Sequence, residues 1–248
     1  NLSLYGSAQT STALGSQGII SDGIACFRLS ITSSKDPPTP FRGRNGQCFN
    51  CQCSMVLSCC YLAPVSHYSA YYRADEVQLE VCDHFVKQTL RNRCWIDSPQ
   101  GALALTVPVV KTEGKTLMRD VRISDHGNWR HQHWVALESS YRQSPFFEYY
   151  ADDFAPFYEK KWDFLADFNE DLMALVASLL DIMKPVTRTA DPPQPSLKGR
   201  GGEIKPLPSG GGLVEAYYQV FASRHGFLTD LSIVDLLFNQ GPEGVLWL

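Results

Sequence analysis

The hydrophobic period of this chain changes near residue 125, and this change constrains its fold more than any other feature. In residues 76–82, Val77, Leu79 and Val81 alternate with polar side chains, a pattern typical of a half-buried strand. From about residue 164 to residue 183, apolar residues recur instead at helical spacing, with acidic residues on the opposite face. The chain therefore predicts strands first and helices afterwards.

The element order follows from the same periods. Before residue 125 we expect strands at 55–62, 76–82, 87–94, 102–110 and 118–124, and a helix at 64–73 that begins at Pro64. After it we expect helices from about residue 128, after Pro145, over 164–183 and 217–225, and from Ser232, with Asp235 in a capping-box position. We predict a single α/β or α+β domain over residues 55–248, with an N-terminal mixed sheet covered by helices from the C-terminal half.

Two segments lack a persistent period. Residues 1–54 are rich in Ser, Gly and Thr, and the first methionine of the chain is Met55. We expect translation to begin at or near Met55, so that residues 1–54 are spurious; a genuine disordered tail fits their composition equally well. Residues 185–212 are rich in Pro and Gly, which predicts a flexible insertion.

The composition excludes several classes of protein. A formal net charge of -4 argues against bulk binding to nucleic acid, which requires many cations. The chain contains no apolar run of the ~18 residues needed to cross a bilayer, so we expect a cytoplasmic protein without a membrane span. Cys48, Cys51 and Cys53 with Cys59 or Cys60 could supply four thiolates, but no second C-x-x-C pair completes a zinc pattern. We expect no metal, and no feature identifies a cofactor.

The string from Lys87 to Cys94 gives the first candidate site. If it forms a strand, Lys87, Arg91 and Arg93 lie on one face, and Asn92 lies on the other, where it would hold a neighbouring loop. Three stacked cations repel one another unless an anion compensates, and arginine binds phosphate bidentately. We interpret this face as a phosphate-binding site; a solvated strand face or a charged sheet edge is the alternative.

Other side chains suggest acid–base chemistry. His133 lies on the apolar stripe that starts at Trp129, where it is either a general base or a histidine at the edge of the core. His131, two residues earlier, diverges from it on a helix, so the pair is a poor metal site. Glu80 precedes the basic string and could act on a substrate or orient the arginines.

The remaining polar and aromatic candidates have structural alternatives. Asp235 is either a catalytic carboxylate or a structural residue that pairs with Arg91 or Arg93, and we favour the structural role. Trp129 and Trp134 are core residues first, although an aromatic side chain at the rim of a cleft could stack on a sugar.

Spaced phrases in the chain resemble one protein family. They are YLAPVSHY (61–68), KQTLRNRC (87–94), LTVPV (105–109), NWRHQHW (128–134), YRQSPFF (141–147), YYQVFASRHGF (217–227) and LSIVDLLFNQGP (231–242). In this order and across residues 55–248, they resemble the WbqC-like proteins, which are found with genes for O-antigen and other surface polysaccharides. Similar proteins tend to have a charged segment in place of residues 185–212, and this difference could impair the site.

The resemblance implies a transferase that modifies a nucleotide-linked sugar, for example by acyl or aminoacyl transfer. We predict that Lys87, Arg91, Asn92, Arg93 and Trp129 bind the substrate, and that His133 and Glu80 are catalytic. The alternative is a non-catalytic module that binds such a sugar, or an enzyme of the same polysaccharide pathway, with the same cations.

Overall fold

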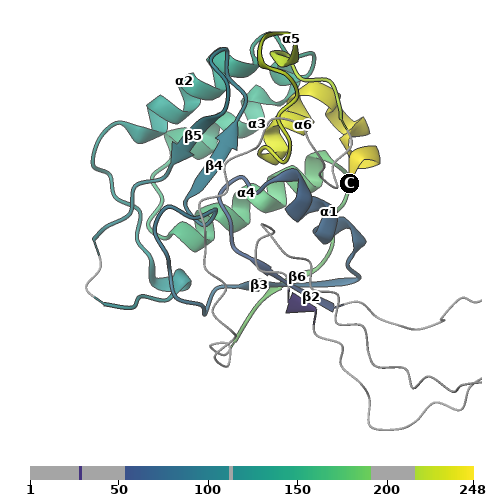
Figure 1. Ribbon diagram of the computed structural model, residues 1–248. Helices are drawn as coiled ribbons and strands as arrows, with labels where there is room; N and C mark the ends of the chain where they lie inside the picture. Colours follow the sequence, from purple (N-terminus) through teal and green to yellow (C-terminus); the bar gives the residue numbers. More distant parts are fainter. Residues whose placement is uncertain (1–27, 30–53, 112–113, 191–215) are drawn as a thin grey trace, which may run out of the picture.

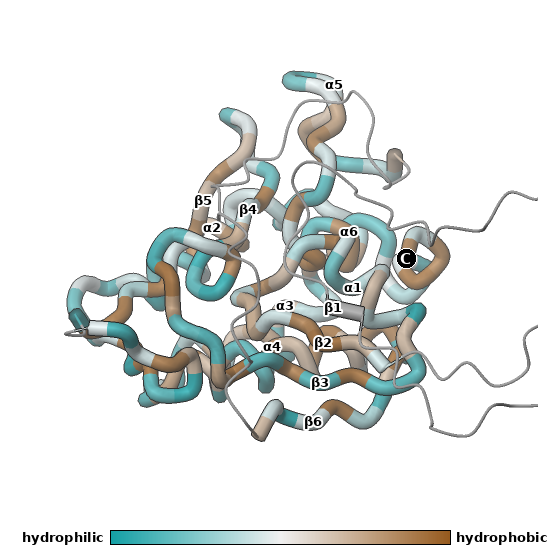
Figure 2. Tube along the Cα trace, turned by 60° about the horizontal axis from the view of Figure 1, so that its bottom comes forward, coloured by the Kyte–Doolittle hydropathy of each residue, from teal (hydrophilic) through white to brown (hydrophobic). Residues whose placement is uncertain are grey.

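A sheet of mainly parallel strands forms one side of the protein in the computed structural model, which describes residues 28–29, 54–111, 114–190 and 216–248. Its order is β1 (Arg28–Leu29), β2 (Ser54–Ser58), β3 (Glu76–Glu80) and β6 (Val186–Arg188). Strands β2, β3 and β6 are parallel, and β1 is antiparallel to β2. Figure 1 shows α1 and α4 above this sheet, and Figure 2 shows apolar residues along the strands.

The first crossover follows the expected order. Strand β2 leads through helix α1 (Val65–Arg73) into β3, and Met55 pairs with Val77 in the ladder. Pro64 lies at the N-cap of α1, where its missing N–H costs nothing. The predicted helix at 64–73 and the predicted strand at 76–82 are confirmed within a few residues.

The predicted strand over residues 87–94 is wrong for most of its length. Residues 87–92 form turns, Gln88 has a φ of 61°, and β4 covers only Arg93–Ile96. Strand β4 pairs with β5 (Leu103–Thr106) in an antiparallel hairpin apart from the main sheet. The string lacked a signal that a half-buried strand requires, because Leu90 is the only apolar residue among positions 88, 90 and 92.

The second half of the chain is helical, as predicted. Its long helices are α2 (Trp129–Tyr141), α3 (Phe147–Glu159) and α4 (Leu165–Leu179). The strand predicted at 118–124 is wrong, since Met118–Asp120 forms the short 3-10 helix η1 and Ile123 makes only an isolated bridge to Val109.

The helix predicted over 217–225 is shorter than expected, whereas the last helix begins after Ser232 and ends before Gly241, as predicted. These helices are α5 (Ala222–His225) and α6 (Ile233–Gln240), and the 3-10 helix η2 (Gly241–Trp247) follows them. The capping box at α6 is wrong: the Ser232 hydroxyl donates to the Leu62 carbonyl, at 2.7 Å, and makes no cap hydrogen bond. Ser232 therefore joins α6 to the turn after β2.

The segment at 185–212 is only partly described. Val186–Arg188 is strand β6, which extends the parallel sheet, so the linker prediction is wrong at these residues. Residues 191–212 of that segment, and residues 1–53 apart from β1, lie outside the described residues. In the described part of the chain, no helix has the length and apolar character needed to cross a membrane. A mixed α/β fold with most helices in the C-terminal half is confirmed.

Candidate functional site

The three cations of the basic string do not share one face. Lys87 is exposed in a turn, whereas Arg91 is largely buried and forms an ion pair with Asp83. The Arg91 backbone carbonyl also accepts a hydrogen bond from Asn169, at 2.8 Å. The Arg91 Nε atom is buried and has no hydrogen-bond partner among the described residues. The turn therefore holds Arg91 in place, and Asp83 already balances its charge.

Asn92 and Arg93 belong to the hairpin. The Asn92 side-chain amide donates to the Val107 carbonyl, at 3.0 Å, and the Asn92 backbone carbonyl accepts from the Val107 N–H, at 2.8 Å. The Arg93 Nε atom donates to the Thr106 hydroxyl, at 3.0 Å. Asn92 holds a neighbouring segment, as the sequence indicated.

Glu80 ends strand β3. Its carboxylate accepts hydrogen bonds from the Cys82 N–H, at 2.8 Å, and from the Thr189 hydroxyl, at 3.0 Å. Thr189 directly follows β6, so Glu80 links the ends of two parallel strands. These contacts tie Glu80 to the sheet and not to the basic turn.

His133 and Trp129 lie on the buried face of α2. Both are 5% exposed, and their rings meet edge to face with centroids 5.2 Å apart. Burial lowers the pKa of His133 to about 4. The imidazole is therefore neutral near pH 7, and such a weakly basic group is poorly suited to general-base work.

A buried hydrogen-bonded chain runs from His133 to a second helix. Its Nδ1 atom lies 2.9 Å from the hydroxyl of Tyr61, and that hydroxyl lies 2.9 Å from the hydroxyl of Tyr158 on α3. Burial raises the pKa of both phenols. Both tyrosines therefore stay protonated at neutral pH.

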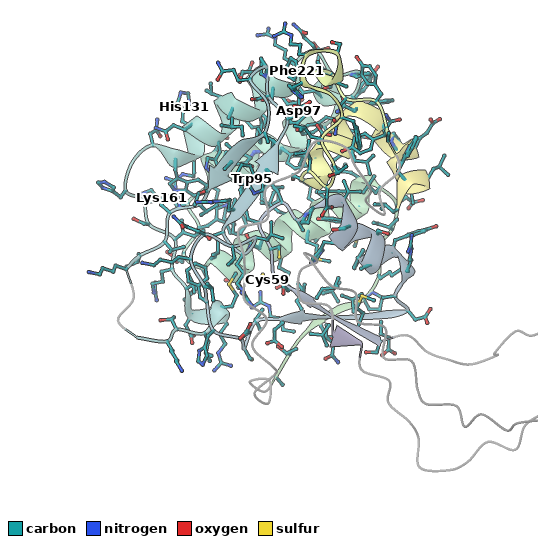
Figure 3. All side chains as sticks on the ribbon, viewed as in Figure 1. Cys59, Trp95, Asp97, His131, Lys161 and Phe221 are labelled. Atoms are coloured by element: carbon teal, nitrogen blue, oxygen red, sulfur yellow. The ribbon has the colours of Figure 1, made fainter. Side chains whose placement is uncertain are left out.

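Tyr158 also lines a pocket between α2 and α3. The pocket has a volume of about 360 Å³. Its lining residues come from the N-terminal part of α2 and the C-terminal part of α3, and they are Asn128, Arg130, His131, Trp134, Ala155, Tyr158 and Glu159. Figure 3 places His131 at the outer edge of the molecule. The pocket thus combines aromatic rings, a cation, an imidazole and a carboxylate.

Asp125, which is not among the lining residues, pairs with two cations, one of which is the lining residue Arg130. Its carboxylate lies 2.6 Å from Arg130 Nη1 and 3.0 Å from Lys161 Nζ. Hydrogen bonds from Arg130 and Lys161 lower the pKa of Asp125. The guanidinium of Arg130 also lies 5.6 Å from the ring centroid of Trp129. These contacts position Arg130, and its other N–H groups make no hydrogen bond to the residues that the structure describes.

A second cluster of buried polar groups surrounds Asp235, which is 0% exposed. The carboxylate accepts hydrogen bonds from the Tyr141 hydroxyl at 2.9 Å, the Tyr217 hydroxyl at 2.6 Å and the Gln219 amide at 3.0 Å. Burial, opposed by these bonds, raises its pKa to about 7. The predicted pairing of Asp235 with an arginine is wrong, because the hydrogen bonds that it accepts come from these neutral groups.

Four cysteines are buried among the described residues: Cys59, Cys60, Cys82 and Cys94. Burial raises the pKa values of Cys59 and Cys94, so these two are inert as nucleophiles. In the described ranges, no three His, Cys, Asp or Glu side chains gather to hold a metal ion. Cys48, Cys51 and Cys53 lie outside those ranges.

The pocket and the predicted site residues of α2 lie on different faces of the helix. Trp129 and His133 belong to the apolar stripe that faces the core, whereas Arg130 and Trp134 line the pocket at i, i+4 spacing. The signal was present, because the phrase NWRHQHW contains Asn128, Arg130, His131 and Trp134. Tyr61 and Tyr158 could not be paired without the fold, since 97 positions separate them.

Comparisons with known proteins identify the family to which the chain belongs. Over 109 residues the chain is 34% identical to the uncharacterized protein Rv1507c of Mycobacterium tuberculosis. That match covers 43% of this chain and 47% of the relative, so the chain spans about half the length of the curated relative it matches. No solved structure matches. The model of the WbqC-like protein family matches residues 60–199, more than half of the 248 residues, and the chain therefore belongs to the WbqC-like protein family.

Proposed function

We propose that this protein is a transferase that binds a phosphate-linked sugar in the pocket between α2 and α3 and acts in the assembly of a surface polysaccharide. The observation that carries the proposal is the set of lining residues. Trp134 and Tyr158 supply rings, Arg130 and His131 supply donors, and Glu159 supplies a carboxylate. The expected association of such proteins with polysaccharide genes supports the same substrate class.

The pocket suits a sugar in size and chemistry. Its volume of about 360 Å³ lies in the range of roughly 300–1,000 Å³ that is typical of small-molecule sites. A sugar ring has an apolar C–H face that stacks on an aromatic side chain, and its hydroxyls need donors and acceptors around them. Trp134 is half-buried at the pocket and offers the ring face, while Asn128 and Glu159 offer the polar partners.

Phosphate recognition falls to Arg130 and the start of α2. The first N–H groups of a helix and its dipole favour an anion, and α2 begins at Trp129, between the lining residues Asn128 and Arg130. Arg130 is already oriented by Asp125 and Trp129, so little side-chain entropy is lost when it binds. A local cationic site of this kind is compatible with the net charge of -4.

In an acyl transfer, an amine or hydroxyl of the sugar attacks the carbonyl carbon of the donor. The new C–N or C–O bond forms, the bond to the leaving group breaks with its electron pair, and a base takes the proton of the attacking group. Glu159 and His131 are the two groups lining the pocket that can accept this proton. In this scheme they replace His133 as the candidate bases.

A binding measurement with matched variants tests the proposal. Purified protein titrated with uridine diphosphate glucose should bind less tightly as salt rises, and Arg130→Ala should weaken binding about tenfold or more. Arg142→Ala is the matched control, because Arg142 lies at the C-terminal end of α2 and its side chain is 74% exposed. Equal affinity in all three proteins, or no binding to a panel of nucleotide-sugars, would count against the proposal.

A non-catalytic binding module is the second candidate, and the burial of His133 favours it. Removing both candidate bases, in a Glu159→Gln, His131→Asn double variant, separates the two functions. An enzyme loses product formation but keeps much of its affinity for the sugar. A module still supports polysaccharide assembly in cells that carry the double variant.

The buried thiols suggest where the reaction takes place. Buried cysteines that form no disulfide, such as Cys59 and Cys94, are typical of a reducing compartment. This supports a cytoplasmic reaction, where nucleotide-linked sugars would be the available form of the substrate.

A further inference from the structure

The carboxylate of Asp125 joins two cations, one near the start of α2 and one just after α3. Its Oδ1 atom lies 2.6 Å from Arg130 Nη1, and its Oδ2 atom lies 3.0 Å from Lys161 Nζ. Arg130 belongs to the first turn of α2, and α3 ends at Glu159. A phosphate group contacts cations in the same way, through several oxygens of one anionic centre. Asp125 therefore occupies a place between Arg130 and Lys161 that a phosphate group fits.

This place adjoins the pocket between α2 and α3. Arg130 and Glu159 both line the pocket, and Lys161 follows Glu159 closely along the chain. Figure 3 shows Lys161 on the same side of the view as the lining residue His131. A ligand whose phosphate lies between the two cations can therefore place the rest of its structure in the pocket.

The ion pairs of Asp125 can open, because they lie at the surface. The side chain of Asp125 is 50% exposed and that of Lys161 is 75% exposed. Exposed ion pairs contribute little to stability, and exposed side chains change rotamer within nanoseconds. The pair between Arg91 and Asp83 differs, since the Arg91 side chain is only 11% exposed. Removing Asp83 from Arg91 would leave a largely buried charge without a partner.

We propose that Asp125 is an internal competitor of the ligand, which occupies the anion site of the empty pocket until a phosphate displaces it and binds Arg130 and Lys161 together. The inference rests on the proposed function and deepens it, because it adds Lys161 as a second phosphate-binding residue. A phosphate monoester carries about two negative charges near pH 7, whereas the carboxylate of Asp125 carries one. The additional charge favours the phosphate over Asp125 between two cations.

The competing interpretation makes Asp125 only a positioning residue that holds Arg130 for the ligand. The two interpretations predict effects of opposite sign. If Asp125 competes, its neutral replacement by Asn frees both cations and tightens anion binding. Arg130 keeps its contact with the ring of Trp129, whose centroid lies 5.6 Å away. If Asp125 only positions Arg130, the same replacement weakens binding.

The first test uses inorganic pyrophosphate in metal-free buffer, so that no sugar is needed. Calorimetric titration of the full chain should show about fivefold tighter binding in Asp125→Asn than in wild type. Asp120→Asn is the matched control, because it makes the same change of charge at a 61% exposed side chain that also pairs with an arginine, Arg119. Its affinity should stay within about twofold of wild type, since the remaining effect is long-range and screened.

The second test removes the added cation. Lys161→Ala should weaken pyrophosphate binding about fivefold. Lys160→Ala is the control, because Lys160 is the neighbouring residue and its Nζ atom lies over the ring of Trp162, 4.3 Å from the centroid. All four variants have substitutions at exposed side chains, and thermal unfolding checks that each retains the wild-type fold.

The outcomes separate this inference from the proposed function when the titrations are repeated with glucose 1-phosphate. If pyrophosphate shows both effects but no sugar phosphate binds, the sugar function fails and the anion site remains. If glucose 1-phosphate binds and Arg130→Ala weakens it, while Asp125→Asn binds as wild type does or more weakly, the competition is overturned and the proposed function remains. Equal affinities in Lys161→Ala and Lys160→Ala, or no pyrophosphate binding even to Asp125→Asn, would also overturn the inference.

Discussion

His67 and His133 show at the level of single residues how burial sets chemistry. Both imidazoles are at most 5% exposed, and burial lowers the pKa of each to about 4. An unfolded chain would bind a proton at each site below about pH 6.5, whereas the folded chain binds it only near pH 4. Folding stability must therefore fall as pH drops through this window.

We expect the free energy of unfolding to decrease by roughly 3 kcal/mol per buried histidine between pH 6.5 and pH 4. A His67→Gln variant should remove about half of the combined decrease. Urea unfolding at several pH values measures it, and His131→Gln, at an exposed position, is the control that should keep the wild-type slope. An unchanged slope in His67→Gln would show that His67 titrates equally in both states.

Asp235 has the opposite pH dependence. Its pKa is raised to about 7 from an ordinary value of 3.8, so the folded chain holds a proton that the unfolded chain releases between these values. Stability from this residue is greatest below about pH 4 and is lost as pH rises through 7. Wild type measured against Asp235→Asn should therefore lose up to about 4 kcal/mol of relative stability from pH 4 to pH 7. Parallel pH profiles of the two proteins would contradict this.

Residue types alone indicated some of these roles. The alternatives for His133 included a histidine satisfied by one hydrogen bond, and the structure shows it buried and bonded to Tyr61. Asp235 was expected to have a structural role, either as a helix-capping residue or as the ion-pair partner of an arginine. Its actual partners Tyr217 and Gln219 precede α5, in residues that were predicted to be helical, and only the fold brings them to α6.

At the level of elements, the end of α6 depends on a glycine. Gly241 has a φ of 61°, and a Cβ atom there would lie 2.7 Å from the ring of Phe146. Gly226, which follows α5, also has a positive φ, but a Cβ atom there would meet nothing within 4 Å. The first position therefore combines backbone strain with a steric clash, and the second has the strain alone.

We expect Gly241→Ala to destabilise the protein by about 3 kcal/mol and Gly226→Ala by about 1 kcal/mol. Thermal or urea unfolding of both variants measures the difference, which reports the contact with Phe146. Equal losses in the two variants would show that α6 and α3 move apart at little cost.

The elements that could be predicted were those with a strong period of their own. The alternation of 76–82 and the helical stripe of α4 depend on burial of one face, which the sequence records directly. The turn at 87–92 was predicted as a strand from its alternating cations. The opposite face of such a strand would carry only one apolar side chain, Leu90, which is too few for a half-buried strand. Strand β6 was hidden because three residues beside a proline-rich segment carry no period, and their pairing with β3 is a long-range contact.

At the level of the whole molecule, two regions are candidates for the proposed phosphate site. The basic turn holds Arg91 against Asp83, and the pocket between α2 and α3 holds Arg130 beside Trp134 and Glu159. Sequence reasoning pointed to the turn, since three cations stood close together along the chain. Both arginines are paired, Arg91 with Asp83 and Arg130 with Asp125. We propose the pocket, because it adds a concave surface, rings and a carboxylate to its cation.

A structure of the full chain with bound uridine diphosphate glucose tests this choice most directly. We predict electron density for the sugar between α2 and α3, against Trp134, with a phosphate at Arg130. Density at Lys87, Arg91 and Arg93, with the pocket between α2 and α3 empty, would contradict it.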